Sequence, residues 1–100
     1  MSHGLALTLK CLYELIYIES AISFIDTYKH FLRKSKLIND RPGKKYLNFL
    51  KYVSGLIKLK LNYEDFALAE LKKQFLSSAE IIQSDWIKEK IYEMERKNKL

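Results

Sequence analysis

The chain contains few of the residues that interrupt or cross-link a fold. Its 100 residues include one proline, three glycines and one cysteine. So little glycine and proline favours long regular elements, and a single cysteine excludes an internal disulfide. The fold therefore does not depend on an oxidising compartment. Cys11 stands among leucines in the sequence, where we expect a small buried thiol and not a nucleophile.

Long hydrophobic runs are also missing, since no stretch approaches the roughly 20 apolar residues that span a bilayer. The amino terminus lacks the basic start and apolar block of a signal peptide. These two absences predict a cytoplasmic protein with no membrane partner. Residues 1–4 have the character of a cloning remnant, so we expect one domain over residues 5–100 that begins inside a helix and belongs to a longer protein.

The residues that are present favour an all-α fold. Hydrophobic residues make up 48% of the chain and include thirteen aromatics, which is ample material for one core. Leu, Lys, Ile and Glu, which helices accept readily, dominate the composition. The spacing of the apolar residues predicts five antiparallel helices, over residues 5–15, 18–34, 42–61, 63–77 and 85–97.

The first two predicted helices form a hairpin. One face of the first helix is apolar, and the chain turns tightly near residues 16–18. Two helices joined so briefly must run antiparallel with their apolar faces together. The second helix directs one stripe of residues inward: Ile18, Ala21, Ile22, Ile25, Tyr28 and Leu32.

The three later helices are predicted to pack on that hairpin. Gly55 either permits a close helix contact or marks a bend, and Asn62 ends its helix in a left-handed conformation. Ser84 is expected to cap the last helix, with Trp86 against the helix over residues 63–77. The helix over residues 42–61 directs seven residues inward: Tyr46, Leu47, Phe49, Leu50, Val53, Leu56 and Ile57.

Positive charge is concentrated in the middle of the chain. Residues 29–60 hold ten Lys and Arg against one acid, whereas the remainder holds eight basic and eleven acidic residues. The commoner interpretation is a solvated surface, but a basic corner interleaved with Tyr46 and Tyr52 also suits the phosphate backbone of RNA or DNA. The candidate phosphate-binding residues are Arg33, Lys34, Lys36, Arg41, Lys44, Lys45 and Lys51.

Catalytic and ligand motifs are weak. His30 has no second His or Cys in helical register, and no glycine-rich phosphate loop occurs. We therefore predict no catalytic residue, metal or cofactor. Four aromatics of the hairpin have two interpretations, a ligand groove or the commoner core packing: Tyr13, Tyr17, Phe24 and Tyr28.

The hairpin, residues 5–34, resembles a tetratricopeptide repeat (TPR). That repeat has a small residue midway along its second helix and a large residue four positions later, which here are Ala21 and Ile25. Leu5, Leu9 and Leu12 occupy first-helix positions where the repeat usually has an aromatic residue, a glycine and a tyrosine, and Ile18 stands where it has an aromatic residue just after the turn. The sequence departs from the repeat at Leu9 and Ile16, which replace glycines, and at Tyr28, which replaces an alanine.

Residues 41–97 resemble the non-repeat helical ending of bacterial TPR-like proteins. The resemblance implies the C-terminal closing segment of a solenoid, acting as a non-catalytic protein–protein interaction scaffold. Its partner would be another protein or the preceding repeats, docked on the outer side of the first helix. Without that neighbour we expect homo-oligomers to form through three partly bare leucines: Leu5, Leu7 and Leu12. The alternative function is non-specific RNA or DNA binding through the basic corner, residues 33–51.

Overall fold

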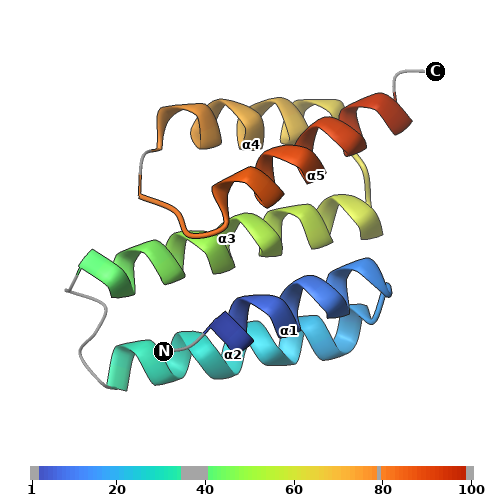
Figure 1. The fold of residues 1–100 in the computed structure, drawn as a ribbon. Helices are drawn as coiled ribbons and strands as arrows, with labels where there is room; N and C mark the ends of the chain where they lie inside the picture. The colour runs from blue at the N-terminus through green and yellow to red at the C-terminus, as the bar shows by residue number, and fades with distance from the viewer. Residues whose placement is uncertain (1–2, 35–40, 79, 99–100) are drawn as a thin grey trace.

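The computed structural model describes residues 3–34, 41–78 and 80–98, with side chains from residue 6 onward. It contains five helices, α1 (His3–Glu14), α2 (Ile18–Lys34), α3 (Arg41–Leu61), α4 (Asp65–Ser77) and α5 (Ser84–Lys97) (Figure 1). No strand occurs in the described part of the chain. The predicted all-α fold of five helices is therefore confirmed, and the predicted helix boundaries lie within two residues of those observed.

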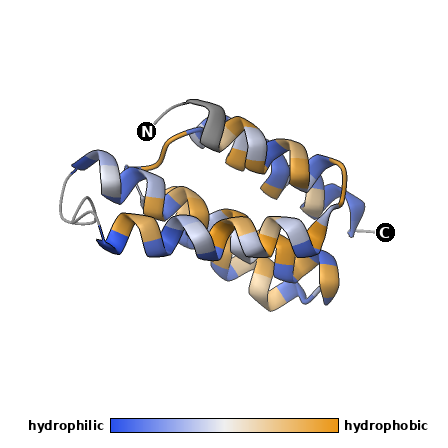
Figure 2. Ribbon diagram, turned by 90° about the horizontal axis from the view of Figure 1, so that it is seen from below, coloured by the Kyte–Doolittle hydropathy of each residue, from blue (hydrophilic) through white to orange (hydrophobic). Residues whose placement is uncertain are grey.

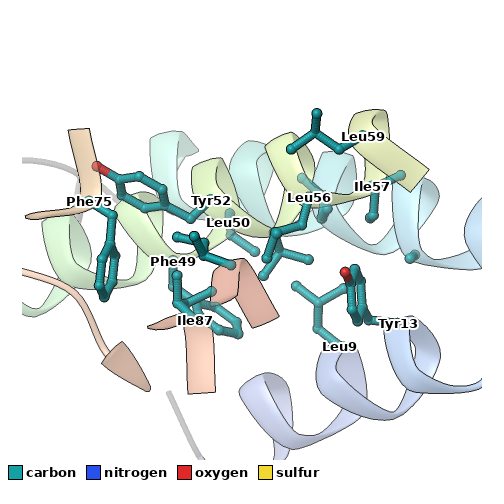
Figure 3. Close-up of a cluster of buried hydrophobic side chains, with 14 of the residues drawn as sticks. Leu9, Tyr13, Phe49, Leu50, Tyr52, Leu56, Ile57, Leu59, Phe75 and Ile87 are labelled. Carbon is teal, nitrogen blue, oxygen red and sulfur yellow. The ribbon is translucent and has the colours of Figure 1, made fainter. Parts of the chain in front are cut away.

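The helices are stacked around α3. The α1–α2 hairpin lies on one side of α3, and α4 and α5 lie on the other side (Figure 1). Successive helices run in opposite directions, as the short connections require. Side chains from all five helices meet in one core, where Phe49 and Leu56 of α3 lie near Leu9 of α1 and Ile87 of α5 (Figure 3). Because α3 contacts α2, α4 and α5, it is the element that joins the two sides.

The turn between α1 and α2 is tight and strained. The N–H of Ile16 donates to the carbonyl of Tyr13 at 3.1 Å, and the N–H of Tyr17 donates to the carbonyl of Leu12 at 2.9 Å. Closing this turn places Ile16 at φ 61°, the left-handed region that glycine favours and β-branched residues avoid. The predicted hairpin is confirmed, and Ile16 is its strained residue.

Gly55 permits α4 to approach α3 closely. A Cβ added at this glycine would lie 2.8 Å from Cδ1 of Leu71, which is closer than carbon atoms pack. The prediction of a close helix contact at Gly55 is confirmed. The helix α3 continues from Arg41 to Leu61 without interruption at this position.

Three predictions about individual apolar residues are wrong. Cys11 is exposed, because it lies on the side of α1 away from the core. Ile22 is also exposed, since the buried stripe of α2 is narrower than the sequence suggests and follows Ala21, Ile25 and Leu32. Tyr52, assigned to the basic corner, is buried against Phe75 with ring centroids 5.8 Å apart.

Two predicted helix ends and one aromatic contact also differ. The helix α3 ends at Leu61, directly before Asn62 as predicted, but Asn62 is not left-handed, since positive φ among the described non-glycine residues occurs at Ile16 and Gln83. Gln83, not Ser84, occupies the N-cap position of α5. Trp86 packs on α1 and α3, with its ring 5.4 Å from that of Tyr13 and 6.3 Å from that of Phe49. The reason is that α5 packs on α3 and also contacts α1, where Lys90 pairs with Glu14.

A polar cluster holds α5 against α1. Lys90 is only 4% exposed, and its Nζ lies 2.9 Å from the carboxylate of Glu14 and 3.4 Å from that of Glu93. Burial by itself lowers the pKa of Lys90, but the carboxylates of Glu14 and Glu93 outweigh this effect and raise that pKa above its ordinary value. Nearby, Lys10 donates to Oε1 of Gln83 at 3.0 Å. We call these contacts the α1–α5 clasp.

Tyr13 and Lys60 adjoin the clasp. The ammonium of Lys60 lies 4.3 Å from the centre of the Tyr13 ring, within the range of a cation–π contact. Burial lowers the pKa of Lys60, and repulsion from Lys97 and Lys90 lowers it further against the opposing effect of Glu14 and Glu93. Burial raises the pKa of Tyr13, and the negative charges of Glu93 and Glu14 raise it further. The clasp is therefore most favourable when Tyr13 is neutral and Lys90 is charged.

Candidate protein-docking groove on the first hairpin

A groove of about 700 Å³ runs along the open side of the α1–α2 hairpin. We call it the hairpin groove, and it is lined by Leu12, Glu19, Ser20, Ser23, Phe24, Thr27 and Tyr28. Figure 2 shows the hairpin from below, where α1 and α2 lie side by side with apolar and polar residues interleaved along both. Six of the seven residues that line the groove belong to α2, and Leu12 belongs to α1.

The sequence of α2 explains why a groove forms here. Ser20, Ser23 and Thr27 recur at intervals of three and four residues on the side opposite the buried residues of α2. Their small side chains leave space that longer residues would fill. Next to them, Phe24 and Tyr28 are one turn apart, with ring centroids at 4.6 Å. The groove therefore combines a polar floor of small residues with an aromatic wall.

The aromatic wall extends toward the end of α2. The rings of Tyr28 and Phe31 lie 6.4 Å apart in an edge-to-face arrangement, and Phe31 is exposed. Phe24 and Tyr28 are each half-buried, as is Leu12 on the facing helix. Half-buried aromatic and aliphatic residues on both sides of a groove are typical of a surface that receives an apolar side chain or a helix.

Only part of the predicted docking surface on α1 coincides with this groove. Leu12 lines it, but Leu7 is five residues earlier, which places it about 140° around the helix. Leu7 is 58% exposed and shares a helix face with Lys10 and Glu14, the residues that contact α5. The backbone of Leu5 belongs to α1, but its side chain lies outside the described residues. Leu7 and Leu12 are both partly exposed, as predicted, but they lie on different faces of α1, and their role in docking stays a prediction.

The four aromatics of the hairpin are divided between the two interpretations, core packing and a groove. Tyr13 is a buried core residue, and Tyr17 is exposed at the turn between α1 and α2. Phe24 and Tyr28 do line a groove, together with residues that sequence reasoning missed: Glu19, Ser20, Ser23 and Thr27. The available signal was the spacing of small polar residues along one side of a helix whose other side is apolar.

The basic corner is distributed over two helices. Arg33 and Lys34 are exposed in the last turn of α2, where positive charge suits the helix dipole. The other described members belong to α3: Arg41, Lys44, Lys45 and Lys51. Lys36 lies outside the described residues.

Two contacts reduce what this corner offers to a phosphate backbone. Nε of Arg41 donates to Oε1 of Glu80 at 3.1 Å, so part of its charge is neutralised. Lys51 lies over the ring of Tyr52, at 5.6 Å from its centre. Because Tyr52 is buried, it cannot stack on a base as single-strand binding requires.

Two observations describe what else the molecule contains. Within residues 3–34, 41–78 and 80–98, no three His, Cys, Asp or Glu side chains are grouped so that they could hold a metal ion. None of the described helices has both the length and the apolar content needed to cross a membrane.

The chain matched no protein-family model, no curated protein and no solved structure. Function therefore has to be inferred from the surface of the molecule itself. The hairpin groove is one of several hollows on the described surface, which also include one of about 480 Å³ between α3 and α4.

Proposed function

We propose that the protein is a non-catalytic protein–protein interaction scaffold of the helical-repeat type, and that the hairpin groove receives a helix of its partner. The supporting observation is the open edge of the hairpin, where Leu12, Phe24 and Tyr28 face a groove of about 700 Å³ that no other part of the described chain fills. In a solenoid each repeat packs on its neighbours, so an uncovered groove on a terminal hairpin is a place where another helix can pack.

The chemistry of the groove suits a helix better than a small molecule. Its wall is a row of rings along one helix, and its floor is lined by small hydroxyl side chains that permit a close approach. An amphipathic helix that binds such a groove uses side chains at intervals of three, four and seven residues. The partner would be a helical pair in the same chain or a separate protein.

The test is sedimentation at low and high protein concentration. With the groove uncovered, the isolated chain should associate as its concentration rises. Ser23→Arg places a long charged side chain in the groove without touching the core, and it should abolish that association. Ser84→Arg adds the same charge to an exposed serine of α5 and should leave the association unchanged. A strict monomer at every concentration, or association that Ser23→Arg does not weaken, would count against the groove as a docking site.

Binding of RNA or DNA through the basic corner is the second candidate, supported by the exposed cations Arg33, Lys34 and Lys44. It predicts affinity that falls steeply with salt and is lost in a Lys44→Glu, Lys45→Glu variant. A binding titration with single-stranded RNA at two salt concentrations separates the two functions. The scaffold proposal predicts that this charge reversal leaves groove-dependent self-association intact.

A further inference from the structure

The helix α4 has a second apolar face that does not pack on this molecule. Phe66 is 75% exposed and Leu76 is 61% exposed, and Ala69 and Lys73 between them are also exposed. These four residues are spaced by three, four and three positions, which places them on one side of the helix. We call this side the α4 stripe.

The α4 stripe points away from the rest of the molecule. Leu71 faces Gly55 of α3, and Leu68 and Phe75 are buried in the core. Ala69 and Lys73 are each two residues from Leu71, about 200° around the helix, so they lie on its opposite side. Figure 1 shows α4 at the upper edge of the molecule and the α1–α2 hairpin at the lower edge, with α3 between them. The stripe and the hairpin groove therefore lie on opposite faces.

The stripe and the groove are complementary in form. Phe66 and Leu76 are ten residues apart, about 15 Å along a helix, and the part of the groove on α2 runs from Glu19 to Tyr28, about 14 Å. The stripe offers protruding apolar side chains, whereas the groove offers half-buried rings beside a floor of small residues. A closing repeat requires a polar outer face, and the α4 stripe is not one.

Charge favours the same pairing. The stripe carries Lys73, and the groove carries Glu19 at its edge. Both side chains are exposed, and within the described residues neither has an ion-pair partner. Docking of the stripe in the groove would bring opposite charges together, whereas two stripes or two grooves facing each other would offer no such match.

We propose that the hairpin groove is occupied by the α4 stripe of a second copy of this chain. This inference rests on the proposed function and identifies the partner. Because the two surfaces differ and lie on opposite faces, the contact is head-to-tail and each bound pair leaves one stripe and one groove free. The copies therefore form a ring or an open filament, a solenoid assembled from separate chains.

The first test compares two leucines of similar exposure. Leu76→Glu places a charge in the stripe, whereas Leu61→Glu changes a leucine that is 64% exposed at the end of α3, outside both surfaces. Leu76→Glu should weaken self-association at least tenfold in sedimentation, and Leu61→Glu should leave it unchanged. Equal effects of the two variants would overturn the assignment of the stripe.

The second test mixes two variants that each lack one surface. Ser23→Arg blocks the groove but keeps the stripe, and Phe66→Glu with Leu76→Glu blocks the stripe but keeps the groove. Each variant alone should be monomeric, and their mixture should form a dimer with one copy of each. Failure to form this mixed dimer would overturn head-to-tail pairing, since symmetric pairing through a single surface cannot produce it.

The third test exchanges the charges. Lys73→Glu should weaken association about two- to fivefold, which is the range for one exposed ion pair. Adding Glu19→Lys to the same chain should restore the original affinity. If Ser23→Arg abolishes association while the stripe variants and the charge exchange do nothing, the groove remains a docking site but its occupant is not α4. If Ser23→Arg also has no effect, the proposed function itself fails.

Discussion

Replacing Ile16 with glycine should stabilise the protein. Ile16 has φ 61°, a conformation that costs residues other than glycine about 1–2 kcal/mol. Glycine removes this cost, but its greater conformational freedom in the unfolded chain offsets about 0.5–1 kcal/mol of the resulting gain in stability. The side chain of Ile16 is 64% exposed, so its removal uncovers little of the core. We expect a net gain of about 0.5–1 kcal/mol in the free energy of unfolding, or about 2–8 °C in Tm.

Urea and thermal denaturation measure this gain, and two controls separate the backbone from the side chain. Ile16→Ala removes the exposed apolar surface but retains a Cβ, so it should not stabilise. Ile16→Asn should give part of the gain, because asparagine tolerates the left-handed conformation. Equal stabilisation by alanine and glycine would refute the argument from φ, as would a loss of stability in Ile16→Gly.

Gln83 provides a comparison within the same chain. It also has positive φ, at 54°, but its Oε1 accepts a hydrogen bond from Lys10 in the α1–α5 clasp. Gln83→Gly removes the cost of the positive φ, but it also removes the hydrogen bond from Lys10. It should therefore raise the free energy of unfolding by less than Ile16→Gly does.

Three further changes test the packing and the clasp. Gly55→Val should lower the free energy of unfolding by about 1–3 kcal/mol in urea denaturation, because the new side chain meets Leu71. Leu9→Ala should cost about 2–5 kcal/mol in the same assay because Leu9 is fully buried, whereas Leu7→Ala should change stability by less than about 0.5 kcal/mol. The pKa of Tyr13 is higher in the folded state than in the unfolded chain, so the folded state favours the neutral phenol. The contribution of Tyr13 to the free energy of unfolding is therefore fully present below about pH 10 and is lost progressively as the pH rises above that value. Tyr13→Phe should therefore show a smaller fall in stability between pH 9.5 and 11 than the unchanged protein.

The helices and the hairpin could be predicted because they depend on local patterns. Apolar residues recur with the period of a helix, and the link near Ile16 is too short for any arrangement other than an antiparallel pair. The long third helix follows from the same reasoning, and its core positions Phe49, Leu50, Val53 and Leu56 are buried as predicted.

The position of α5 could not be predicted, because it depends on contacts between distant parts of the chain. The periodicity of α5 shows that one face is apolar, but it does not show which helices that face will meet. Trp86 was therefore assigned to α4 although it packs against Tyr13 and Phe49. The burial of Lys90 was missed for the same reason, since its partner Glu14 belongs to the first helix.

The docking surfaces were missed for two different reasons. Grouping Leu7 with Leu12 ignored the rotation of the helix between them, which the sequence does contain. The hairpin groove instead required knowing which side of α2 remains open, and this depends on where α3 packs. The exposure of Phe66 and Leu76 also required the packed structure, which shows that α4 has apolar residues on both sides.

The α1–α5 clasp sets the order in which the protein can be completed during synthesis. Glu14 and Lys90 are 76 positions apart. At a translation rate of about 5–20 residues per second, the ribosome adds Lys90 about 4–15 s after Glu14. During this interval Lys10 and Glu14 of α1 have no partner on α5, so the clasp is among the last contacts of the fold that can form.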